Sequence, residues 1–504
     1  MKIIQPLIYA VLISIGIFIG NISNSENYVH ENKIDNILKI IDNHYVDSIN
    51  YSDFENNTIN TFLNELDPHS SYISVNDYKS IEEDMTGSFS GIGVEFNIIE
   101  DSIVVISPIE GGPSKKLGIK SGDRIITVED KDVASIGVKN ETVIKLLRGE
   151  KGSEVNVKIK RRGTKGLILF KIIRDDIPLV SVSAGILLDD KIGYLKINRF
   201  AATTFDEMNK KCNKLINQGM EKLILDFRGN PGGYLHISNQ ICDEFLKEGE
   251  LIVFTEGRNR ERNEIYATSN GELQNIDIIC LIDEGSASAS EIVSGAIQDN
   301  DRGLIIGRRS FGKGLVQEQI RLTDGSVMRL TTQRYYTPSG RCIQKDYGKN
   351  SKEYFLEQYT RNEQLQKYDT LEYKTKEGRL VYGGGGITPD IRINRDTTLN
   401  YFPINKMIRD GVINKFCFEK SELLKKTKVK SYKHLQINRI YEDFNNYISN
   451  DKLELGEKEL KYLKNMLLAN ISKNIWGENT YYEIICIEDE FVQTALKQFN
   501  SIPL

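Results

Sequence analysis

The sequence predicts a mixed α/β and α+β protein made of several domains. Between residues 191 and 307, strand-like apolar runs alternate with amphipathic helical stretches, which is the pattern of parallel βα units. Residues 91–161 show short alternating strands separated by glycine turns, while both ends of the chain have helical spacing. A length of 504 residues is enough for two or three domains.

The first residues form a separate apolar segment. Ile3 to Ile22 is almost entirely apolar, is preceded by Lys2, and is long enough to span a bilayer. A cleaved signal peptide is the alternative, but residues 20–25 match a small-residue cleavage site poorly. We favour an uncleaved anchor within residues 1–25. The positive charge before it predicts that the remainder lies outside the cytoplasm, on the periplasmic side of the inner membrane.

A helical segment and a β-rich module follow. Residues 26–85 have helical periodicity, interrupted at 67–71, and we interpret this segment as packing. Residues 86–175 form the module, with strands predicted at 91–99, 101–107, 117–128 and 154–161. Its one clear helix is expected over Asn140 to Leu147, with Asn140 as a candidate N-cap.

The βα part, residues 176–397, brings distant segments together. Strands are expected at 191–197, 222–227, 276–283 and 303–307, and helices at 205–218, 234–246 and 288–298. Loops that follow parallel strands lie at one edge of the sheet, where ligands bind. The Gly232–Gly233 turn, Ser288 and Lys313 each follow such a strand and are therefore predicted to meet at one site. Residues 398–504 are charged and helical, and their role stays open.

Composition limits the chemistry that the chain can perform. A net charge of -5 gives no indication of nucleic-acid binding. The six cysteines are spread without a CxxC pair, which resembles neither a disulfide framework nor a zinc site. We expect no structural metal and no cofactor.

Ser288 is a candidate nucleophile at a predicted helix start. Ser288 and Glu291 form an S-x-x-E signature, so a simple helix cap is the plain alternative. Gly285 and the neighbouring alanines favour an accessible hydroxyl instead. Spacing alone does not choose among Ser286, Ser288 and Ser290.

Lys313 is the candidate base, because none of the five histidines lies in or between these segments. A lysine base needs a pKa of roughly 7–8, about three units below its free value, which burial can supply. Gln317 lies an even number of residues after Lys313 along a predicted strand, so the two side chains are expected to face the same side. The neutral amide of Gln317 can then hold the amine. Residues 307–314 nearly match a phosphate-binding loop, but Gly314 replaces the metal-binding hydroxyl and a strand pattern follows. Backbone amides of Ala289 and of the Gly232–Gly233 turn are candidate oxyanion donors.

Together these pieces resemble the carboxyl-terminal processing (tail-specific) serine proteases. The matching motifs, in family order over roughly residues 30–395, are Gly87–Val94, Leu225–Gly233, Ser286–Glu291, Ser310–Gly314 with Gln317, Tyr335–Arg341 and Gly386–Asp390. The resemblance implies a catalytic core of the crotonase/ClpP-like type. It also implies Ser288 as nucleophile, Lys313 as base and Gln317 as its partner, which resolves the choice among the serines.

The β-rich module then resembles a PDZ domain, which binds C-terminal peptides as an added strand. The resemblance implies that Gly91, Ile92, Gly93 and Val94 bind the substrate terminus. It further implies that Arg148 has a gating role. An equal alternative is that Arg148 is an exposed, solvated arginine without such a role.

The expected partners are protein or peptide substrates with apolar C-termini, the cytoplasmic membrane and an activator or adaptor protein, with no nucleic acid. An oligomer is compatible with the sequence. The alternative functions are an inactive tail-binding adaptor and a crotonase-like acyl-thioester enzyme. Intact Ser288, Lys313 and Gln317 oppose the first, and the export segment opposes the second.

Overall fold

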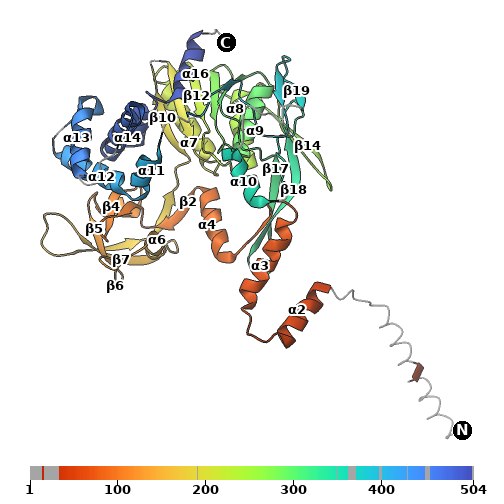
Figure 1. The fold of residues 1–504 in the computed structure, drawn as a ribbon, viewed down its shortest axis with the longest axis horizontal. Coiled ribbons are helices and arrows are strands. Elements are labelled where there is room, and N and C mark those ends of the chain that lie inside the picture. The colour runs from red at the N-terminus through yellow and green to blue at the C-terminus, as the bar shows by residue number, and fades with distance from the viewer. Residues whose placement is uncertain are drawn as a thin grey trace, which may run out of the picture. The chain divides into compact units, whose positions relative to one another are not determined.

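A computed structural model describes residues 14–15, 33–189, 191–348, 350–360, 371–396, 400–427, 429–448 and 454–501 (Figure 1). It divides into two units, residues 1–65 and 66–504. The first unit contains helices α2 (Lys33–His44) and α3 (Tyr51–Asn64). The predicted membrane segment lies almost wholly outside the described residues, and no described helix is long and apolar enough to cross a bilayer.

The second unit begins with a short strand, a helix and the β-rich module. The entry elements are β1 (Ser71–Ile73), α4 (Val75–Thr86) and β2 (Ser88–Gly91). The module is an antiparallel sheet in the order β3-β4-β5-β7-β8, with β6 added to β5. Its elements are β3 (Val94–Ile98), β4 (Ile103–Pro108), α5 (Pro113–Lys116), β5 (Arg124–Val128), β6 (Lys131–Asp132), α6 (Asn140–Leu147), β7 (Glu154–Lys160) and β8 (Ile168–Ile173).

Alternating side chains build the core of this module. Val155, Val157 and Ile159 of β7 are fully buried, as the period of two along a strand requires. Strand β9 (Asp175–Pro178) pairs with β2 in a separate two-stranded sheet. Asn140 is the first helical residue and Lys139 is the N-cap, so the predicted cap is wrong by one position.

The βα part is built on a second sheet in the order β10-β11-β12-β15-β16-β21. All neighbours from β11 to β21 are parallel and β10 is antiparallel. The strands are β10 (Val182–Leu187), β11 (Ile192–Ile197), β12 (Lys222–Asp226), β15 (Asp277–Ile282), β16 (Gly303–Gly307) and β21 (Ile391–Arg392). The predicted βα units are thus confirmed, and the mixed α/β multidomain fold with them.

Helices α7 (Thr204–Ile216), α8 (Leu235–Phe245) and α9 (Ala289–Asp299) cover one face of this sheet. A smaller sheet, in the order β1-β18-β13-β14 with β17 on β18, flanks the core. Its later strands are β13 (Leu251–Gly257), β14 (Arg260–Tyr266), β17 (Leu315–Arg321) and β18 (Val327–Tyr336). Helix α10 (Ser351–Thr360) and the hairpin β19 (Glu372–Lys374) and β20 (Leu380–Tyr382) complete the region.

The C-terminal residues are helical, as predicted. They comprise α11 (Phe402–Arg409), α12 (Val412–Leu424), η1 (Lys425–Thr427), η2 (Tyr432–His434), α13 (Ile437–Tyr447), α14 (Glu457–Trp476), α15 (Glu478–Ile485) and α16 (Glu490–Ser501). Helices α11 to α14 enclose a core of their own around Phe416, Phe444 and Leu467. In contrast, Phe491 and Val492 of α16 pack on the sheet of β10 to β21, on the face opposite α7 to α9.

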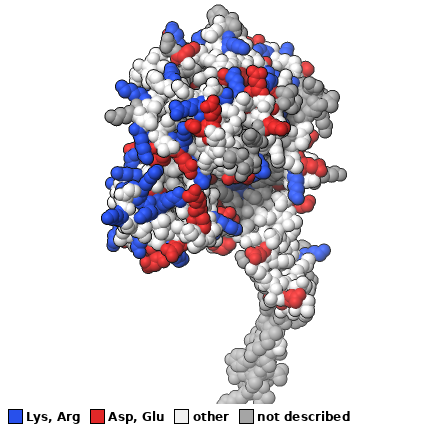
Figure 2. Space-filling view, turned by 60° about the vertical axis from the view of Figure 1, so that its left-hand side comes forward, with Lys and Arg blue, Asp and Glu red and all other residues white. Residues whose placement is uncertain are grey.

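Surface charge is of mixed sign. On the face shown in Figure 2, acidic side chains lie among the lysines and arginines. This agrees with a net charge close to neutrality for the chain.

Candidate active site

Ser288 lies on a sharp turn between strand β15 and helix α9. Its backbone has φ 55° and ψ -114°, in the left-handed half of conformational space, which is strained for a residue with a side chain. A strained strand-to-helix turn of this kind exposes a nucleophile at the edge of a parallel sheet. Helix α9 begins at the next residue, Ala289. Ser288 is thus both a helix N-cap and a cleft residue.

The glycine turn after β12 packs directly against Ser288. A methyl group on Gly232 would lie 2.8 Å from Ser288 Cβ and 3.0 Å from the amide nitrogen of Ala289. The Gly232 amide already donates to Asn230 Oδ1, at 2.9 Å, so the prediction that it is an open oxyanion donor is corrected. The amides of Gly233 and Ala289 have no acceptor among the described residues. They are the two available donors beside Ser288.

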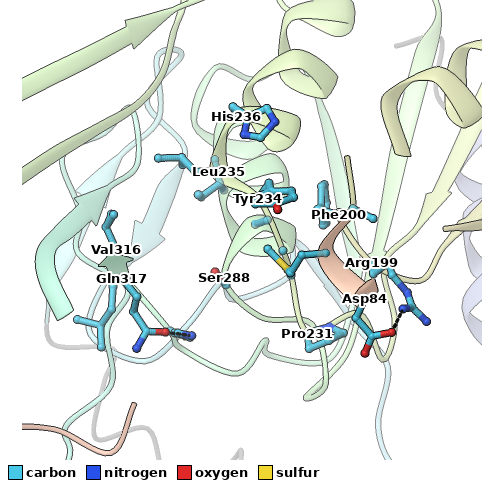
Figure 3. A pocket seen from close by; sticks show the side chains of 18 of the residues that line it. Asp84, Arg199, Phe200, Pro231, Tyr234, Leu235, His236, Ser288, Val316 and Gln317 are labelled. Atoms are coloured by element: carbon cyan, nitrogen blue, oxygen red, sulfur yellow. Dashed lines mark hydrogen bonds and ion pairs between the residues drawn. The ribbon is translucent and has the colours of Figure 1, made fainter. Parts of the chain in front are cut away.

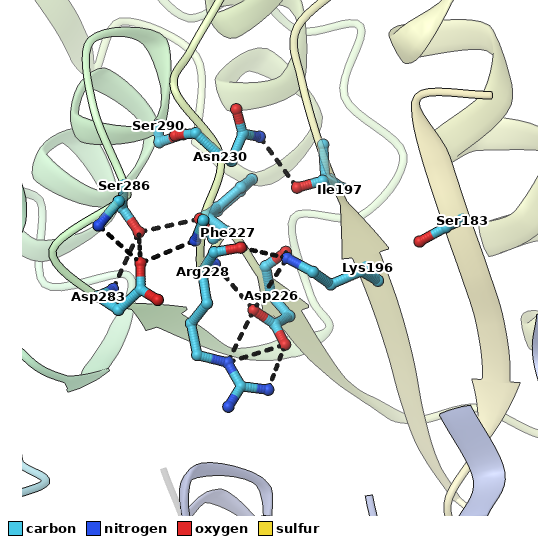
Figure 4. A network of polar contacts seen from close by, with 12 residues as sticks. Ser183, Lys196, Ile197, Asp226, Phe227, Arg228, Asn230, Asp283, Ser286 and Ser290 are labelled. Carbon is cyan, nitrogen blue, oxygen red and sulfur yellow. Dashed lines mark hydrogen bonds and ion pairs between the residues drawn. The ribbon is translucent and has the colours of Figure 1, made fainter. Parts of the chain in front are cut away.

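A network of polar contacts holds the glycine turn next to the serine loop (Figure 4). Asp283 Oδ1 accepts the amide of Gly229 at 2.8 Å and that of Gly285 at 3.0 Å, linking the two loops. Ser286 Oγ donates to the carbonyl of Phe227 at 2.9 Å. The same turn is fixed by a buried ion pair between Arg228 and Asp226. Burial disfavours the ionised Asp226, but the charges of Arg228 and Lys196 outweigh it and lower the Asp226 pKa.

Lys313 is a half-buried amine held by a neutral partner. Its Nζ donates to Gln317 Oε1 at 2.9 Å, and Gln317 Nε2 donates to the carbonyl of His69 at 2.7 Å. Burial, together with the positive charge of Arg329, lowers the pKa of Lys313 to about 8. Burial also lowers the pKa of His69 to about 3, so this imidazole is neutral.

The contact between Lys313 and Gln317 is present, but its predicted cause is wrong. Strand β17 begins at Leu315, after the lysine, and its pairing is irregular between Val316 and Gln317. A regular even step along one strand therefore does not explain why the two side chains meet. The strand beginning here also removes the helix that a phosphate-binding loop would need.

Ser288, Lys313 and the glycine turn line one cleft with a volume of about 750 Å³ (Figure 3). No described hydrogen bond joins Ser288 Oγ to Lys313 Nζ. The other lining residues are Ile81, Asp84, Met85, Asn198, Arg199, Phe200, Ala201, Pro231, Tyr234, Leu235, His236, Ala289, Ile292, Leu315, Val316, Gln317, Gln319, Arg329 and Tyr335. The structure thus brings together the segments that the order of the strands predicts.

Comparisons with known proteins identify the family of this chain. A family model described as peptidase family S41 matches residues 191–351, and a PDZ domain model matches residues 90–171. The carboxy-terminal processing protease CtpB of Bacillus subtilis is 33% identical over 326 residues, which cover 64% of this chain and 67% of that protein. The chain belongs to the carboxy-terminal processing proteases of peptidase family S41.

Further relatives of this S41 protease match over similar lengths. A carboxy-terminal-processing protease of Bartonella bacilliformis is 38% identical over 57% of this chain and 66% of that protein. A probable CtpA-like serine protease of Staphylococcus aureus is 33% identical over 64% of each chain. The chain thus aligns with about two thirds of these relatives' lengths.

Solved structures of similar proteins include a photosystem II D1 C-terminal processing protease. It is 26% identical, with a TM-score of 0.37, and the match covers 67% of this chain and 81% of that one. The PDZ domain of a carboxy-terminal protease from Vibrio cholerae, in complex with peptide, is 31% identical. Its TM-score is 0.17, and the match covers 18% of this chain and 99% of that one.

The PDZ domain of this S41 protease presents the predicted terminus-binding loop beside an open strand. Gly93 has φ 72°, and a methyl group there would lie 2.8 Å from Ile177 Cδ1, which explains the glycine. The carbonyl of Ile92 accepts from both the amide and the hydroxyl of Ser114. Strand β3, which begins at Val94, pairs only with β4 and leaves its other edge free within the described sheet.

Arg148 joins the PDZ domain to the helix that lines the catalytic cleft. Its guanidinium donates to Glu83 of α4 at 2.7 Å and lies 4.1 Å from the centre of the Phe89 ring. Helix α4 also carries Ile81 and Met85, which line the cleft. Arg148 is therefore a paired, half-buried side chain and not a freely solvated charge.

Sequence reasoning missed Glu291 as an organiser of the site. This buried carboxylate accepts the amides of Ser288, Gly312 and Lys313 and the hydroxyl of Ser310 at 2.5–2.9 Å. Burial raises its pKa to about 7, while these hydrogen bonds favour the ionised form. The S-x-x-E signature was a usable signal, but it indicates only the local cap.

The roles of Tyr335 and Arg329 in the site were also missed, although Tyr335 begins one of the family motifs. The Tyr335 hydroxyl lies 2.6 Å from the carbonyl of Lys313 and 3.1 Å from that of Ser288, so it links the two loops. Arg329 lines the cleft and acts on the lysine by charge. Both belong to β18, a strand that the sequence analysis did not predict.

The described residues include no group of three or more His, Cys, Asp or Glu side chains placed to hold a metal ion. All six cysteines are free thiols.

Proposed function

We propose that this protein is a serine endopeptidase with Ser288 as nucleophile and Lys313 as general base. The observation that carries the proposal is the lowered pKa of a half-buried lysine in the cleft that contains the strained serine. About one tenth of an amine with pKa 8 is neutral at pH 7, so a usable base is present.

The first step forms a bond between Ser288 Oγ and the carbonyl carbon of the scissile peptide, while the hydroxyl proton moves to neutral Lys313. The negative charge on the former carbonyl oxygen is stabilised by the amides of Gly233 and Ala289. Collapse of this tetrahedral species breaks the C–N bond, and the lysine returns its proton to the leaving amine. Water then attacks the acyl-enzyme by the same route.

Gln317 positions the lysine in this mechanism. As a neutral acceptor it orients the amine without stabilising its charge as a carboxylate would. Proton transfer needs the amine within hydrogen-bond reach of Ser288 Oγ, a contact that active sites without substrate often leave long. The amine must therefore approach Ser288 when the peptide binds.

The substrate class follows from the PDZ domain. A chain terminus added to the free edge of β3 would place its carboxylate at Gly91 to Val94. We propose that proteins with apolar C-termini bind there and are cleaved near that end. Arg148 is proposed to couple the occupied PDZ domain to α4 and the catalytic cleft, because it contacts both.

A cleavage assay tests the catalytic assignment. A purified protein substrate ending in apolar residues is incubated with wild type, Ser288→Ala, Lys313→Ala and the control Ser294→Ala. Ser294 lies on the same helix, but its hydroxyl donates to the carbonyl of Ser290 and does not line the cleft. We expect the first two variants to lose cleavage and the control to keep it. Near-normal turnover by Lys313→Ala would refute the proposed base.

We also propose that the enzyme acts outside the cytoplasm, held by its apolar N-terminal segment. The support is the sequence of residues 3–22 alone. Cell fractionation, followed by alkaline extraction of the membranes, tests this. Recovery of the full-length chain in the cytosolic fraction would contradict it.

A further inference from the structure

A second cleft lies between the PDZ domain and the C-terminal helices. It has a volume of about 750 Å³ and is bordered by β3, by α6 and by the turn that joins α11 to α12. Figure 1 shows the blue C-terminal helices beside the orange PDZ strands. The lining residues are Phe96, Asn97, Ile98, Ile99, Glu100, Asn140, Ile144, Ile408, Arg409, Asp410, Gly411, Val412, Asn414, Lys415 and Tyr447.

This cleft continues the groove in which a PDZ domain holds a peptide, namely the space between β3 and α6. An added strand runs antiparallel to β3, with its carboxylate at the Gly91–Val94 loop. At about 3.4 Å per residue, the positions roughly three to six residues upstream of the carboxylate pass the end of β3. That end, Ile98 to Glu100, is where the α11–α12 turn lies.

The polar lining of the cleft suits the main chain of an extended peptide. The side-chain amides of Asn97, Asn140 and Asn414 have no hydrogen-bond partner among the described residues. Each offers two donors and an acceptor, which matches the alternating groups of a peptide backbone. Apolar contacts come from Ile98 on the PDZ side and Val412 on the helical side.

The helical wall is fixed to the PDZ domain. Lys415 pairs with Glu100 at 3.1 Å, at the rim of the cleft. Phe418 of α12 is 8% exposed because it packs against Ile99 and Val104 of the PDZ domain. These contacts hold the α11–α12 turn in place beside the groove, so a peptide would meet a prepared surface.

We propose that the α11–α12 turn is a second wall of the tail-binding groove and binds the residues upstream of a substrate's terminus. The proposal rests on tail recognition by the PDZ domain, which is part of the proposed function. Its consequence is a length requirement: a substrate needs an extended tail of about eight residues to occupy both parts of the groove. A tail of four residues uses the PDZ part alone.

Binding of synthetic peptides to the full chain tests the inference, with Ser288→Ala as background to prevent cleavage. The probes are fluorescein-labelled peptides of four and eight residues with the same two C-terminal valines, and the eight-residue peptide with an amidated terminus. The matched variants are Asn414→Ala, in the cleft wall, and Asn445→Ala, an exposed asparagine of α13 that does not line the cleft. Fluorescence anisotropy gives each Kd.

We expect the eight-residue peptide to bind at least about fivefold more tightly than the four-residue peptide. Asn414→Ala should weaken binding of the eight-residue peptide about fivefold, which corresponds to the loss of one hydrogen bond. Four-residue binding and the Asn445→Ala variant should be unchanged. Equal Kd values for both lengths, or an Asn414→Ala variant like wild type, would overturn the inference while tail recognition stands. Tight binding of the amidated peptide would show that the cleft takes internal segments, and binding of neither free peptide would overturn both proposals.

Discussion

The pH dependence of cleavage should follow the proton on Lys313. With a pKa of about 8, the neutral fraction of this amine is about one tenth at pH 7, one half at pH 8 and nine tenths at pH 9. A lysine at the ordinary value of 10.5 would be neutral in only about 3 of 10,000 molecules at pH 7. Burial therefore increases the supply of usable base roughly 300-fold at neutral pH.

The assay is kcat/KM for an apolar-tailed peptide between pH 6 and 10.5, because this constant reports groups of the free enzyme. Circular dichroism over the same range verifies that the protein stays folded. Arg329→Gln removes a positive charge that lowers the lysine pKa, so the midpoint of the profile should move to higher pH. A midpoint at or above pH 10 in wild type, or a shift to lower pH in this variant, would refute the reasoning.

Three further outcomes are expected. Gly233→Ala places a methyl group 2.2 Å from the carbonyl oxygen of Phe200 and should reduce kcat at least about a hundredfold. The control Gly163→Ala, at a glycine of the PDZ domain that also has a positive φ but meets nothing within 4 Å and does not line the cleft, should keep activity within a few-fold; equal losses in steady-state kinetics would contradict this. The pKa of Lys313 in the folded protein lies below its free value, so the charged form of this lysine destabilises the fold, with the full cost present below pH 8. Lys313→Met should therefore raise the free energy of unfolding, measured by urea titration, by up to about 3 kcal/mol at pH 7, and by nothing above about pH 10.5. Glu291→Gln places an NH2 donor at a position where the carboxylate oxygens only accept hydrogen bonds, so it should lower kcat more than it changes KM. An unchanged kcat would show that the carboxylate does not organise the site.

The sequence was informative where the periodicity of apolar residues and the positions of turn residues indicate the same element. Parallel strands such as β12 and β15 are short apolar runs that end in glycine or acidic turns, so their order predicted that Ser288, Lys313 and the glycine turn would share one edge. Strand β18 was missed, although it places Arg329 and Tyr335 in the site. Most of its residues are only partly buried, so it lacks the continuous apolar run of a central strand.

Tertiary partners could not be derived from local patterns. The S-x-x-E signature indicates a cap, but only the fold shows that Glu291 also accepts the amides of Gly312 and Lys313. Likewise, the amphipathic pattern of residues 490–501 predicts a helix without specifying which surface it covers. Hydrophobic packing is non-directional, so a pattern of apolar residues does not name its partner.

The position of α16 bears on how the molecule is made. Ile224, Ile279 and Ile306, from the middle of the chain, are buried beneath Phe491 and Val492, which are synthesised almost two hundred residues later than the last of these strands. Until that helix arrives, part of this face of the sheet is exposed to water, and Arg228, which holds the glycine turn, lacks its second carboxylate, Asp489. We therefore expect a chain shortened before α16 to expose apolar side chains of this sheet and to hold the glycine turn less firmly.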